Sequence, residues 1–497
     1  MPQLPEGEPY VQVRETHTGV VMLCGDRAYK AKKPIVTDFL DFGTPAARER
    51  ACARELELNQ RLAPDVYLGL AHVTDPAGGP AEPLLVMRRM SAAMRLSAVL
   101  ADPSRRPSPL PDLAATVARF HLAARRATEI DEAARPERLR RRWRSLLDPL
   151  ADHPCPGVDP AVLARIDALA MRYIDGRSPL FDERIAAGRI IDGHGDMLAE
   201  DIFVLPDGFR ILDCLDFDDQ LRYVDALDDA AFLAMDLEFL GHPQHARSFL
   251  DDYADAARDP APVTLRHHYI AYRATVRAKT DRVRYDQNDP AAAGNARRHL
   301  DLAVRHLEQG AVRLVLVGGL PGTGKSTVAT QLAAGTDAVV LSSDEVRDRM
   351  RAAGALTGDS GTFGAGAYAP AAKTAVYTTL LELARERLEH GVSVILDASW
   401  TDPAERDRAA ALADQTCSEL VSLHCTCPAE LAHQRIETRT RGYSEATPAI
   451  ADALAATAAP WPEATRVDTA QPLEDSLALA LRAWQDPMCQ QRTVRQR

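Results

Sequence analysis

The stretch Gly319-Leu320-Pro321-Gly322-Thr323-Gly324-Lys325-Ser326-Thr327 has the spacing G-x-x-x-x-G-K-[ST] of a phosphate-binding loop. The pattern predicts an apolar strand directly before it, over 312–318, and an apolar helix directly after it, over 328–334. This order of strand, loop and helix separates a true phosphate-binding loop from a chance match. A chance match is also rare by composition, because the whole chain holds only six lysines.

The chemistry of such a loop predicts a nucleotide site. Backbone N–H groups of the glycine-rich turn and of the following helix N-terminus surround an anionic phosphate. Lys325 adds a mobile positive charge, and Ser326 adds a hydroxyl ligand for Mg²⁺. We therefore expect residues 319–327 to bind the phosphates of ATP. The three hundred residues before them need a separate explanation.

Length and composition narrow the class of protein. A chain of 497 residues predicts two or three domains. The net charge of −12 argues against nonspecific binding to nucleic acid or to anionic membranes, although a local basic cleft for nucleic acid is not excluded. Eight scattered cysteines fit reduced thiols. No signal-peptide pattern and no apolar run long enough for a membrane span are visible, so we expect a cytoplasmic protein.

The order of predicted elements indicates two domains. Short strands are expected over 10–14, 19–24, 28–32 and 83–87, a helix over 46–62, and mainly helices from 110 to 308, with a strand-and-loop block at 189–217. A helix ends at Glu308-Gln309-Gly310, where the strand before the phosphate-binding loop begins. We therefore predict domains over 1–308 and 309–497.

Beyond this boundary, strands and helices alternate. The expected strands lie at 312–318, 338–342, 392–397 and 420–425, with helices between them. Such alternation predicts an α/β domain with a parallel sheet.

Several polar residues of this second domain indicate a small kinase. Asp344 and Arg347 follow a buried strand as D-x-x-R, where the carboxylate can accept a hydroxyl proton and the guanidinium can hold substrate or phosphate. Asp397 ends another buried strand, in the position that orients Mg²⁺ and its waters. Arg435 and Arg439, with Arg441 nearby, could close positive charge over the transferred phosphoryl group. The alternatives are a helix N-cap for Asp344 and surface salt bridges for the arginines.

The region from about 309 to 470 resembles P-loop kinases of small molecules and polynucleotides, namely gluconate-kinase-like, zeta-toxin-like and 5′-polynucleotide-kinase-like proteins. The D-x-x-R at 344–347 and the Asp397 strand, followed by Pro403-Ala404-Glu405-Arg406, carry this resemblance. It implies that Asp344 is the general base and that Arg435 or Arg439 is a lid arginine. The acceptor is not specified by these residues.

A second set of site residues lies in the N-terminal domain. The block 193–203 has the spacing of a kinase catalytic loop, in which Asp196 accepts the hydroxyl proton and Asp201 ligates Mg²⁺. A strand follows and presents a further metal ligand, Asp213 as first choice and Asp216 as second. Upstream, Lys30 on a strand and Glu55 on the next helix would hold the α- and β-phosphates of ATP. Three of the six lysines cluster at 30, 32 and 33.

Residues 10 to 300 thereby resemble the aminoglycoside-phosphotransferase-like, or choline-kinase-like, branch of the protein-kinase fold. The resemblance implies a bilobal α+β domain. Two positions depart from the family pattern: Asp201 stands where Asn is usual, and Leu198 where a second His is usual. A degenerate domain that only binds nucleotide is therefore an alternative to an active kinase.

The order of the two domains resembles bacterial proteins that fuse an aminoglycoside-phosphotransferase-like domain to a P-loop kinase domain. The leading hypothesis is an ATP- and Mg²⁺-dependent phosphotransferase with two nucleotide sites, acting on hydroxyls of small molecules such as sugars or aminoglycosides. A regulatory P-loop ATPase that switches a kinase-like binding module, and a nucleic-acid 5′-kinase, are the alternatives. The acceptor and the oligomeric state do not follow from the sequence.

Two further patterns favour a structural interpretation. In the arginine-rich stretch 137–144, Leu139 and Trp143 share one face of a helix, so the arginines are expected on its solvated side. His424, Cys425 and Cys427 lie in an alternating apolar strand without a second cysteine pair, so they are not expected to bind a metal.

Overall fold

The chain forms two compact units. The computed structural model describes residues 9–15, 19–36, 41–74, 76–102, 104, 108–153, 155–356, 370–438 and 447–486. The N-terminal unit comprises residues 1–163, 183–261 and 269–304, and the P-loop unit comprises 164–182, 262–268 and 305–497. The predicted cut at 308/309 stays a prediction. The P-loop unit also includes residues 164–182, 262–268 and 305–308.

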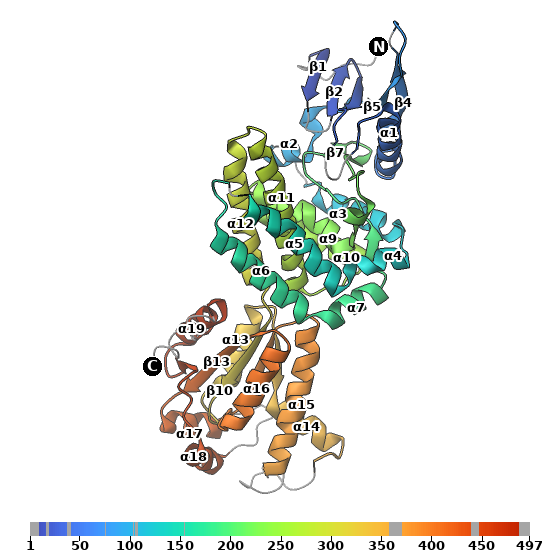
Figure 1. Cartoon of the computed structure of the whole chain (residues 1–497). Coiled ribbons are helices and arrows are strands. Elements are labelled where there is room, and N and C mark those ends of the chain that lie inside the picture. Colours follow the sequence, from blue (N-terminus) through green and yellow to red (C-terminus); the bar gives the residue numbers. More distant parts are fainter. Residues whose placement is uncertain are drawn as a thin grey trace. The chain divides into compact units, whose positions relative to one another are not determined.

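The N-terminal unit begins with an antiparallel sheet (Figure 1). Its strands lie in the order β1 (Val11–Glu15), β2 (Gly19–Cys24), β3 (Arg27–Lys32), β5 (Glu82–Arg88) and β4 (Tyr67–Val73). Helix α1 (Pro45–Asn59) packs against β4 and β5. It begins where the Thr44 hydroxyl accepts a hydrogen bond from the Ala47 N–H, with Pro45 in the first turn.

The rest of this unit is mainly helical and carries two short two-stranded antiparallel sheets. One pairs β6 (Ile190–Asp192) with β9 (Tyr223–Asp225), and the other is the hairpin of β7 (Ile202–Leu205) and β8 (Gly208–Ile211). Its helices are η1 (Ala92–Met94), α2 (Leu96–Ala101), α3 (Leu110–Ala123), α4 (Thr128–Asp131), η2 (Glu132–Ala134), α5 (Pro136–Asp152), α8 (Asp219–Arg222), α9 (Ala226–Phe239) and α10 (Pro243–Ala257). A small sheet with one helix, followed by a helical lobe, is the bilobal protein-kinase-like fold, as the sequence predicts.

Four helices contribute residues to both units: α6 (Pro160–Asp175), α7 (Ser178–Ala186), α11 (Val263–Asp286) and α12 (Ala291–Gln309). The chain therefore passes repeatedly from one unit to the other before it reaches the phosphate-binding loop.

The P-loop unit contains a parallel sheet in the order β11 (Val339–Ser342), β12 (Val394–Asp397), β10 (Arg313–Gly318), β13 (Glu419–Thr426) and β14 (Thr465–Asp468). All of β10 is buried, because it is the central strand. The predicted α/β class with a parallel sheet is confirmed. Sequence analysis did not predict β14, whose one buried residue, Val467, gives little hydrophobic pattern.

Helices cover both faces of this sheet (Figure 1). On one face, α13 (Lys325–Ala334) and α19 (Leu473–Gln485) pack on alternate strand residues such as Val315, Val317 and Val421. The other face carries α15 (Pro370–Glu389) and α16 (Pro403–Gln415). The remaining helices of the unit are α14 (Ser343–Ala352), α17 (Ala429–Glu437) and α18 (Pro448–Thr457). The phosphate-binding loop thus connects the central strand to a helix of the core.

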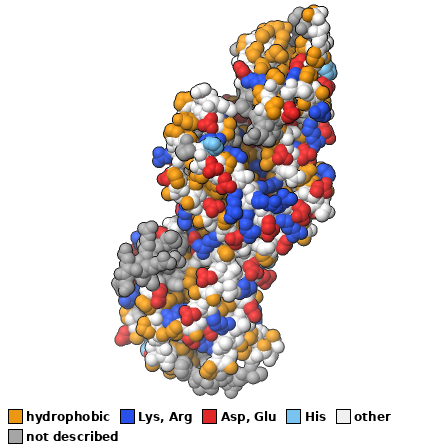
Figure 2. All heavy atoms as spheres, viewed as in Figure 1, with side chains coloured by type: hydrophobic (Ala, Val, Ile, Leu, Met, Phe, Trp, Pro, Cys, Tyr) orange, Lys and Arg blue, Asp and Glu red, His pale blue; other side chains and the backbone are white. Residues whose placement is uncertain are grey.

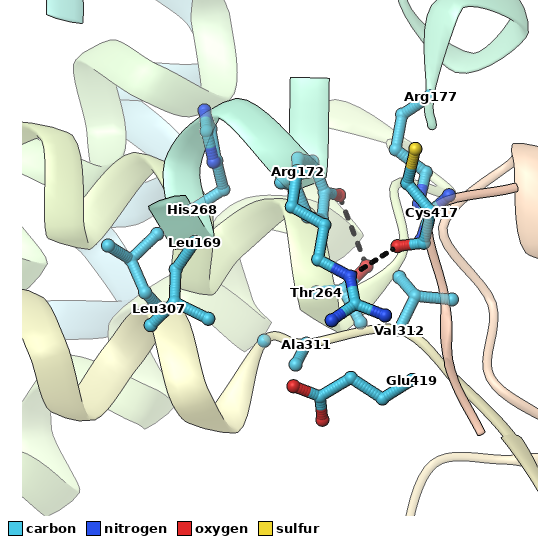
Figure 3. A pocket seen from close by; sticks show the side chains of 12 residues that line it. Leu169, Arg172, Arg177, Thr264, His268, Leu307, Ala311, Val312, Cys417 and Glu419 are labelled. Atoms are coloured by element: carbon cyan, nitrogen blue, oxygen red, sulfur yellow. Dashed lines mark hydrogen bonds between the residues drawn. The ribbon is translucent and has the colours of Figure 1, made fainter. Parts of the chain in front are cut away.

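Arginines tie segment 164–182 to the turn before β13 (Figure 3). Arg172 donates hydrogen bonds to the carbonyl oxygens of Cys417, at 3.0 Å, and Ser418. The fully buried Arg177 donates to the carbonyl oxygen of Thr416 at 2.6 Å. Burial lowers the pKa of its guanidinium to about 10. The adjoining cavity of about 20 Å³ has room for roughly one water molecule, so we interpret it as a packing feature.

The arginine-rich stretch lies on α5. Trp143 is buried, whereas Arg138, Arg141 and Arg144 are exposed. Figure 2 shows many basic side chains on the surface of the helical part of this unit. The expected solvated side is confirmed for these three arginines. Arg142 differs, because it donates hydrogen bonds to two backbone carbonyls at 2.6 Å. Among the described helices, none is long and apolar enough to cross a lipid bilayer.

Candidate active sites

The phosphate-binding loop requires glycine at several positions. Gly319, Gly322 and Gly324 have φ angles of 151°, 80° and 78°. A Cβ atom on Gly322 would lie 2.4 Å from the carbonyl oxygen of Ala432, which is backbone and cannot move aside as a side chain would. Side chains are therefore excluded by conformation and by space.

We expect Gly322→Ala to abolish nucleotide binding at this loop and to destabilise the unit by about 2–3 kcal/mol. Thermal unfolding and ATP titration would measure both effects. Gly354→Ala is the matched control, because Gly354 has a φ of 70° in open space. Equal effects of the two substitutions would show that the close approach to Ala432 has no part in the result.

A cavity of about 420 Å³ opens beside the loop, and Lys325, Ser326 and Thr327 line it together with Arg435 and Thr469. Arg435 donates a hydrogen bond to the carbonyl oxygen of Thr469 at 2.8 Å. The Thr469 hydroxyl in turn donates to the carbonyl oxygen of Thr323 at 2.7 Å. Within the part of the chain that the structure describes, Arg435 makes no surface salt bridge. It lies in the nucleotide cavity instead. Arg439 and Arg441 lie outside the described residues.

Asp397 lies at the end of β12, in register with Val317 and Ser342 on the two neighbouring strands. Burial raises the pKa of this carboxyl, although Lys325 and the Ser326 hydroxyl oppose the shift. Its Oδ1 atom is buried and has no hydrogen-bond partner among the described residues. A buried carboxylate oxygen without a partner, beside the loop hydroxyl, fits the proposed orientation of a hydrated Mg²⁺.

Asp344 lies in the first turn of α14 and is not its N-cap. Ser342 caps this helix, with its side chain accepting from the Asp344 N–H. The N-cap alternative is therefore wrong. Arg347 Nη1 contacts Asp344 Oδ1 at 2.5 Å, so D-x-x-R is an ion pair across one helical turn.

In the N-terminal unit, Glu55 joins two lysines of β3. Lys30 Nζ lies 2.7 Å from one carboxylate oxygen of Glu55, and Lys32 Nζ lies 2.6 Å from the other. The lysines share one face of the strand because they are two residues apart. Each also binds its own aspartate, Lys30 to Asp213 at 3.0 Å and Lys32 to Asp216 at 2.7 Å. The two candidate metal ligands are thus bound by different lysines.

Three predicted site carboxylates influence one another. Burial raises the pKa of Asp196 to about 6, and Asp213 contributes in the same direction. The pKa of Asp201 lies well above its usual range, because of burial and then of Asp213 and Asp196. In contrast, the positive charge of Lys30 lowers the pKa of Asp213. Asp213 also has a φ of 61°, a strained backbone conformation that is common at functional sites.

Asp229 holds the loop before Asp196. Its carboxylate accepts hydrogen bonds from the N–H groups of His194, at 2.6 Å, and Gly195, at 2.8 Å. His121 Nε2 lies 3.1 Å from the same group. Although burial opposes it, the hydrogen bond with His121 lowers the pKa of Asp229 well below its usual range. The negative charge of Asp229 therefore fixes the backbone of the predicted catalytic loop.

Sequence reasoning missed other residues that support these loops. Arg61 donates to the carbonyl oxygens of Asp192, at 3.1 Å, and Gly193, at 2.8 Å. Asn59 accepts the Cys214 N–H at 2.8 Å, and the Tyr67 hydroxyl lies 3.2 Å from the Asp213 N–H. These contacts join residues more than a hundred positions apart, and no local pattern indicates them.

Comparison with known proteins places the whole chain in a family. A family model described as an AAA domain matches residues 314–460. Rv2004c, an uncharacterized protein of Mycobacterium tuberculosis, is 48% identical over 477 residues, which are 96% of each chain. This chain belongs to the family of Rv2004c. The protein Mb2027c of Mycobacterium bovis matches with the same identity and coverage.

Solved structures similar to parts of the chain include kinases of two kinds. A choline/ethanolamine kinase family protein from Mesorhizobium loti is 15% identical, covers 62% of this chain and 94% of its own, and has a TM-score of 0.36. A gluconokinase from Sinorhizobium meliloti is 17% identical, covers 38% and 98%, and has a TM-score of 0.28. The sequence motifs led us to expect these same two kinds of kinase.

The residues present fit Mg²⁺ by the chemistry of their donors. Asp201 and Asp213 in one unit, and Ser326 and Asp397 in the other, offer the oxygen ligands that Mg²⁺ prefers. Burial and then repulsion from Asp213 and Asp196 raise the pKa of Asp201, and a divalent cation would relieve the repulsion. No group of three or more His, Cys, Asp or Glu side chains is arranged around a metal position within the described ranges.

Substitutions of Lys30 and Lys32 on β3 are expected to change different quantities, ATP affinity for Lys30 and the free energy of unfolding for Lys32. Lys30→Ala should weaken ATP binding at the N-terminal site about 30-fold, because its ammonium would contact the phosphates. Lys32→Ala should mainly lower the free energy of unfolding, by about 1–3 kcal/mol, because it leaves the half-buried Asp216 unpaired. Nucleotide titration and denaturant unfolding would separate the two.

Lys33→Ala is the control for both lysines. Among the described residues, the ammonium of Lys33 pairs only with the exposed Glu15, so its loss should change neither quantity. If Lys30→Ala and Lys32→Ala changed ATP affinity and the free energy of unfolding by the same amounts, this assignment of separate roles would be wrong.

Proposed function

We propose that the chain is an ATP- and Mg²⁺-dependent phosphotransferase with two nucleotide sites, and that it phosphorylates hydroxyl groups of small molecules. The observation that carries the proposal is the Lys30–Glu55 ion pair at 2.7 Å, which meets Asp213 in the same unit as Asp196. A separate phosphate-binding loop, with Lys325 and Arg435 lining its cavity, supports the second nucleotide site.

At the N-terminal site, Lys30 holds the α- and β-phosphates and Glu55 holds Lys30. Asp196 takes the proton of the acceptor hydroxyl while the oxygen of that hydroxyl forms a bond to the γ-phosphorus. The bond from that phosphorus to the β,γ-bridging oxygen breaks, and ADP leaves with the electron pair. Mg²⁺, held by Asp213 and Asp201, would neutralise charge on the phosphates when bound. Asp213 is preferred over Asp216 because of its strained φ and its electrostatic coupling to Asp201.

At the P-loop site, the backbone of residues 319–327 and Lys325 hold the phosphates, and Arg435 lies over them from α17. Asp344 is the proposed base, and Arg347, paired with it at 2.5 Å, orients it until the acceptor binds. Ser326 and Asp397 are the proposed ligands of Mg²⁺ and its waters. Arg439 is proposed as a further lid arginine.

The test is a screen of sugars, aminoglycosides, nucleosides and oligonucleotides with labelled ATP, combined with calorimetric counting of nucleotides per chain. Two bound nucleotides and turnover that depends on a small acceptor support the proposal. ATP hydrolysis without an acceptor would favour a regulatory ATPase, and labelled oligonucleotides a 5′-kinase. One nucleotide per wild-type chain would contradict the two-site model.

A further inference from the structure

Helix α11 brings two arginines to the loop that carries Asp196. Arg273 makes a bidentate ion pair with Asp228, at 2.7 and 2.9 Å, and its Nη1 donates to the Gly195 carbonyl oxygen at 3.2 Å. Gly195 directly precedes Asp196 in the chain. Arg277 lies four residues after Arg273, hence one turn further along the same face of the helix.

Arg277 differs from Arg273 in having no hydrogen-bonded or ion-paired partner in the part of the chain that the structure describes. Its side chain is half-buried, and it forms no hydrogen bond or ion pair with any residue in the described ranges. A guanidinium carries five N–H donors in a fixed planar arrangement. Leaving such a group half-buried and unpaired is unfavourable, so a ligand that supplies acceptor oxygens would be bound with a gain in free energy.

The charges that face Arg277 are carboxylates of neighbouring elements. Of the cations near Asp196, Arg277 has the largest influence on the pKa of that carboxyl, followed by Arg273. Asp236, on α9, is also influenced by Arg277, but its carboxylate accepts the Ala199 N–H at 2.8 Å. Since neither aspartate forms an ion pair with Arg277, the N–H donors of its guanidinium have no acceptor among the described residues, although this charge acts on Asp196, where the acceptor hydroxyl would react.

We infer that Arg277 binds an anionic group of the acceptor, a phosphate or a carboxylate, while Asp196 takes the proton from the acceptor hydroxyl. The planar donors of arginine match the paired oxygens of either group. This inference rests on the proposed phosphotransferase function of the N-terminal site and adds the chemical class of its substrate. It predicts a preference for acidic acceptors over neutral or basic ones.

The experiment uses the full chain with Lys325→Ala, so that turnover reports the N-terminal site. Four sugars with similar hydroxyls are compared as acceptors: glucose, glucosamine, glucuronate and glucose 6-phosphate. We expect kcat/KM to be at least about 10-fold higher for one of the two anionic sugars than for glucose. The carboxylate and phosphate arms show which anion the site takes.

Arg277→Gln should lower kcat/KM for the preferred anionic sugar about 100-fold. The value for glucose and the KM for ATP should change by less than about threefold. Arg277→Lys should restore part of the loss, because it keeps the charge without the paired donors. Lys279→Gln is the control for lost charge on α11, since Lys279 donates to the Ser145 carbonyl oxygen at 3.0 Å and has no place at the site.

Equal use of the four sugars, a preference for glucose or glucosamine, or an unchanged preference in Arg277→Gln would overturn the inference while the phosphotransferase function stands. An equal loss on all acceptors would assign Arg277 to the ATP phosphates instead. Calorimetry with a non-hydrolysable ATP analogue is the second readout, and failure of both anionic sugars to bind also overturns it. If the Lys325→Ala protein binds no nucleotide, the proposed function itself fails.

Discussion

Asp196→Asn is expected to lower phosphoryl transfer at the N-terminal site by about 10²- to 10⁴-fold while ATP still binds there. The amide has the shape of the carboxylate but cannot take a proton from the acceptor hydroxyl. The loop itself should persist, because Asp229 fixes it through the N–H groups of His194 and Gly195. The effect belongs in kcat, measured with labelled ATP in the Lys325→Ala background.

The pH dependence of the unsubstituted site gives a second view of Asp196. Burial raises its pKa to about 6, so the carboxyl stays protonated to a higher pH than an exposed aspartate does. Activity should therefore fall as the pH drops through about 6, and this acid limb should be absent from the residual activity of Asp196→Asn.

Asp255→Asn, on an exposed position of α10, is the control and should change neither rate nor profile. Full transfer activity in Asp196→Asn would remove this residue from the mechanism.

Lys325→Ala is expected to reduce the number of nucleotides bound per chain from two to one. The backbone of the phosphate-binding loop would still donate hydrogen bonds, but the one lysine among the described residues that line its cavity would be lost. A missing charge on phosphate corresponds to about 2–4 kcal/mol, or roughly 30- to 1,000-fold in affinity. Calorimetry at micromolar protein concentration would detect the missing event directly.

Lys373→Ala, in the same unit, removes a lysine that contacts Asp402 at 3.5 Å and should leave two nucleotides bound. Two nucleotides in the Lys325→Ala protein would mean that the second site lies elsewhere.

Local patterns predicted much of this molecule. The phosphate-binding loop, the buried strands around it and the paired Lys30 and Glu55 each follow from residue types at short spacing. Strand β14 was not predicted, because an edge strand with one buried residue shows no clear alternation of apolar and polar residues. The capping of α14 was open for a similar reason, since Ser342 and Asp344 are both good N-cap residues two positions apart.

Contacts between residues far apart in the chain could not be predicted from the sequence. Asp213 and Asp216 follow the same strand, and only the folded chain assigns one to Lys30 and the other to Lys32. That Arg277 has no hydrogen bond or ion pair within the described ranges is likewise a property of packing around α11. Residue type alone does not distinguish it from its paired neighbour Arg273.

The division of segments between the two units limits how this gene could be rearranged. A truncation at the predicted boundary would separate Arg172 and Arg177 from the carbonyl oxygens of residues 416–418 that they bind. The half after the boundary is not self-contained, so an exchange of domains by recombination at this one point would leave the P-loop unit without part of its own structure.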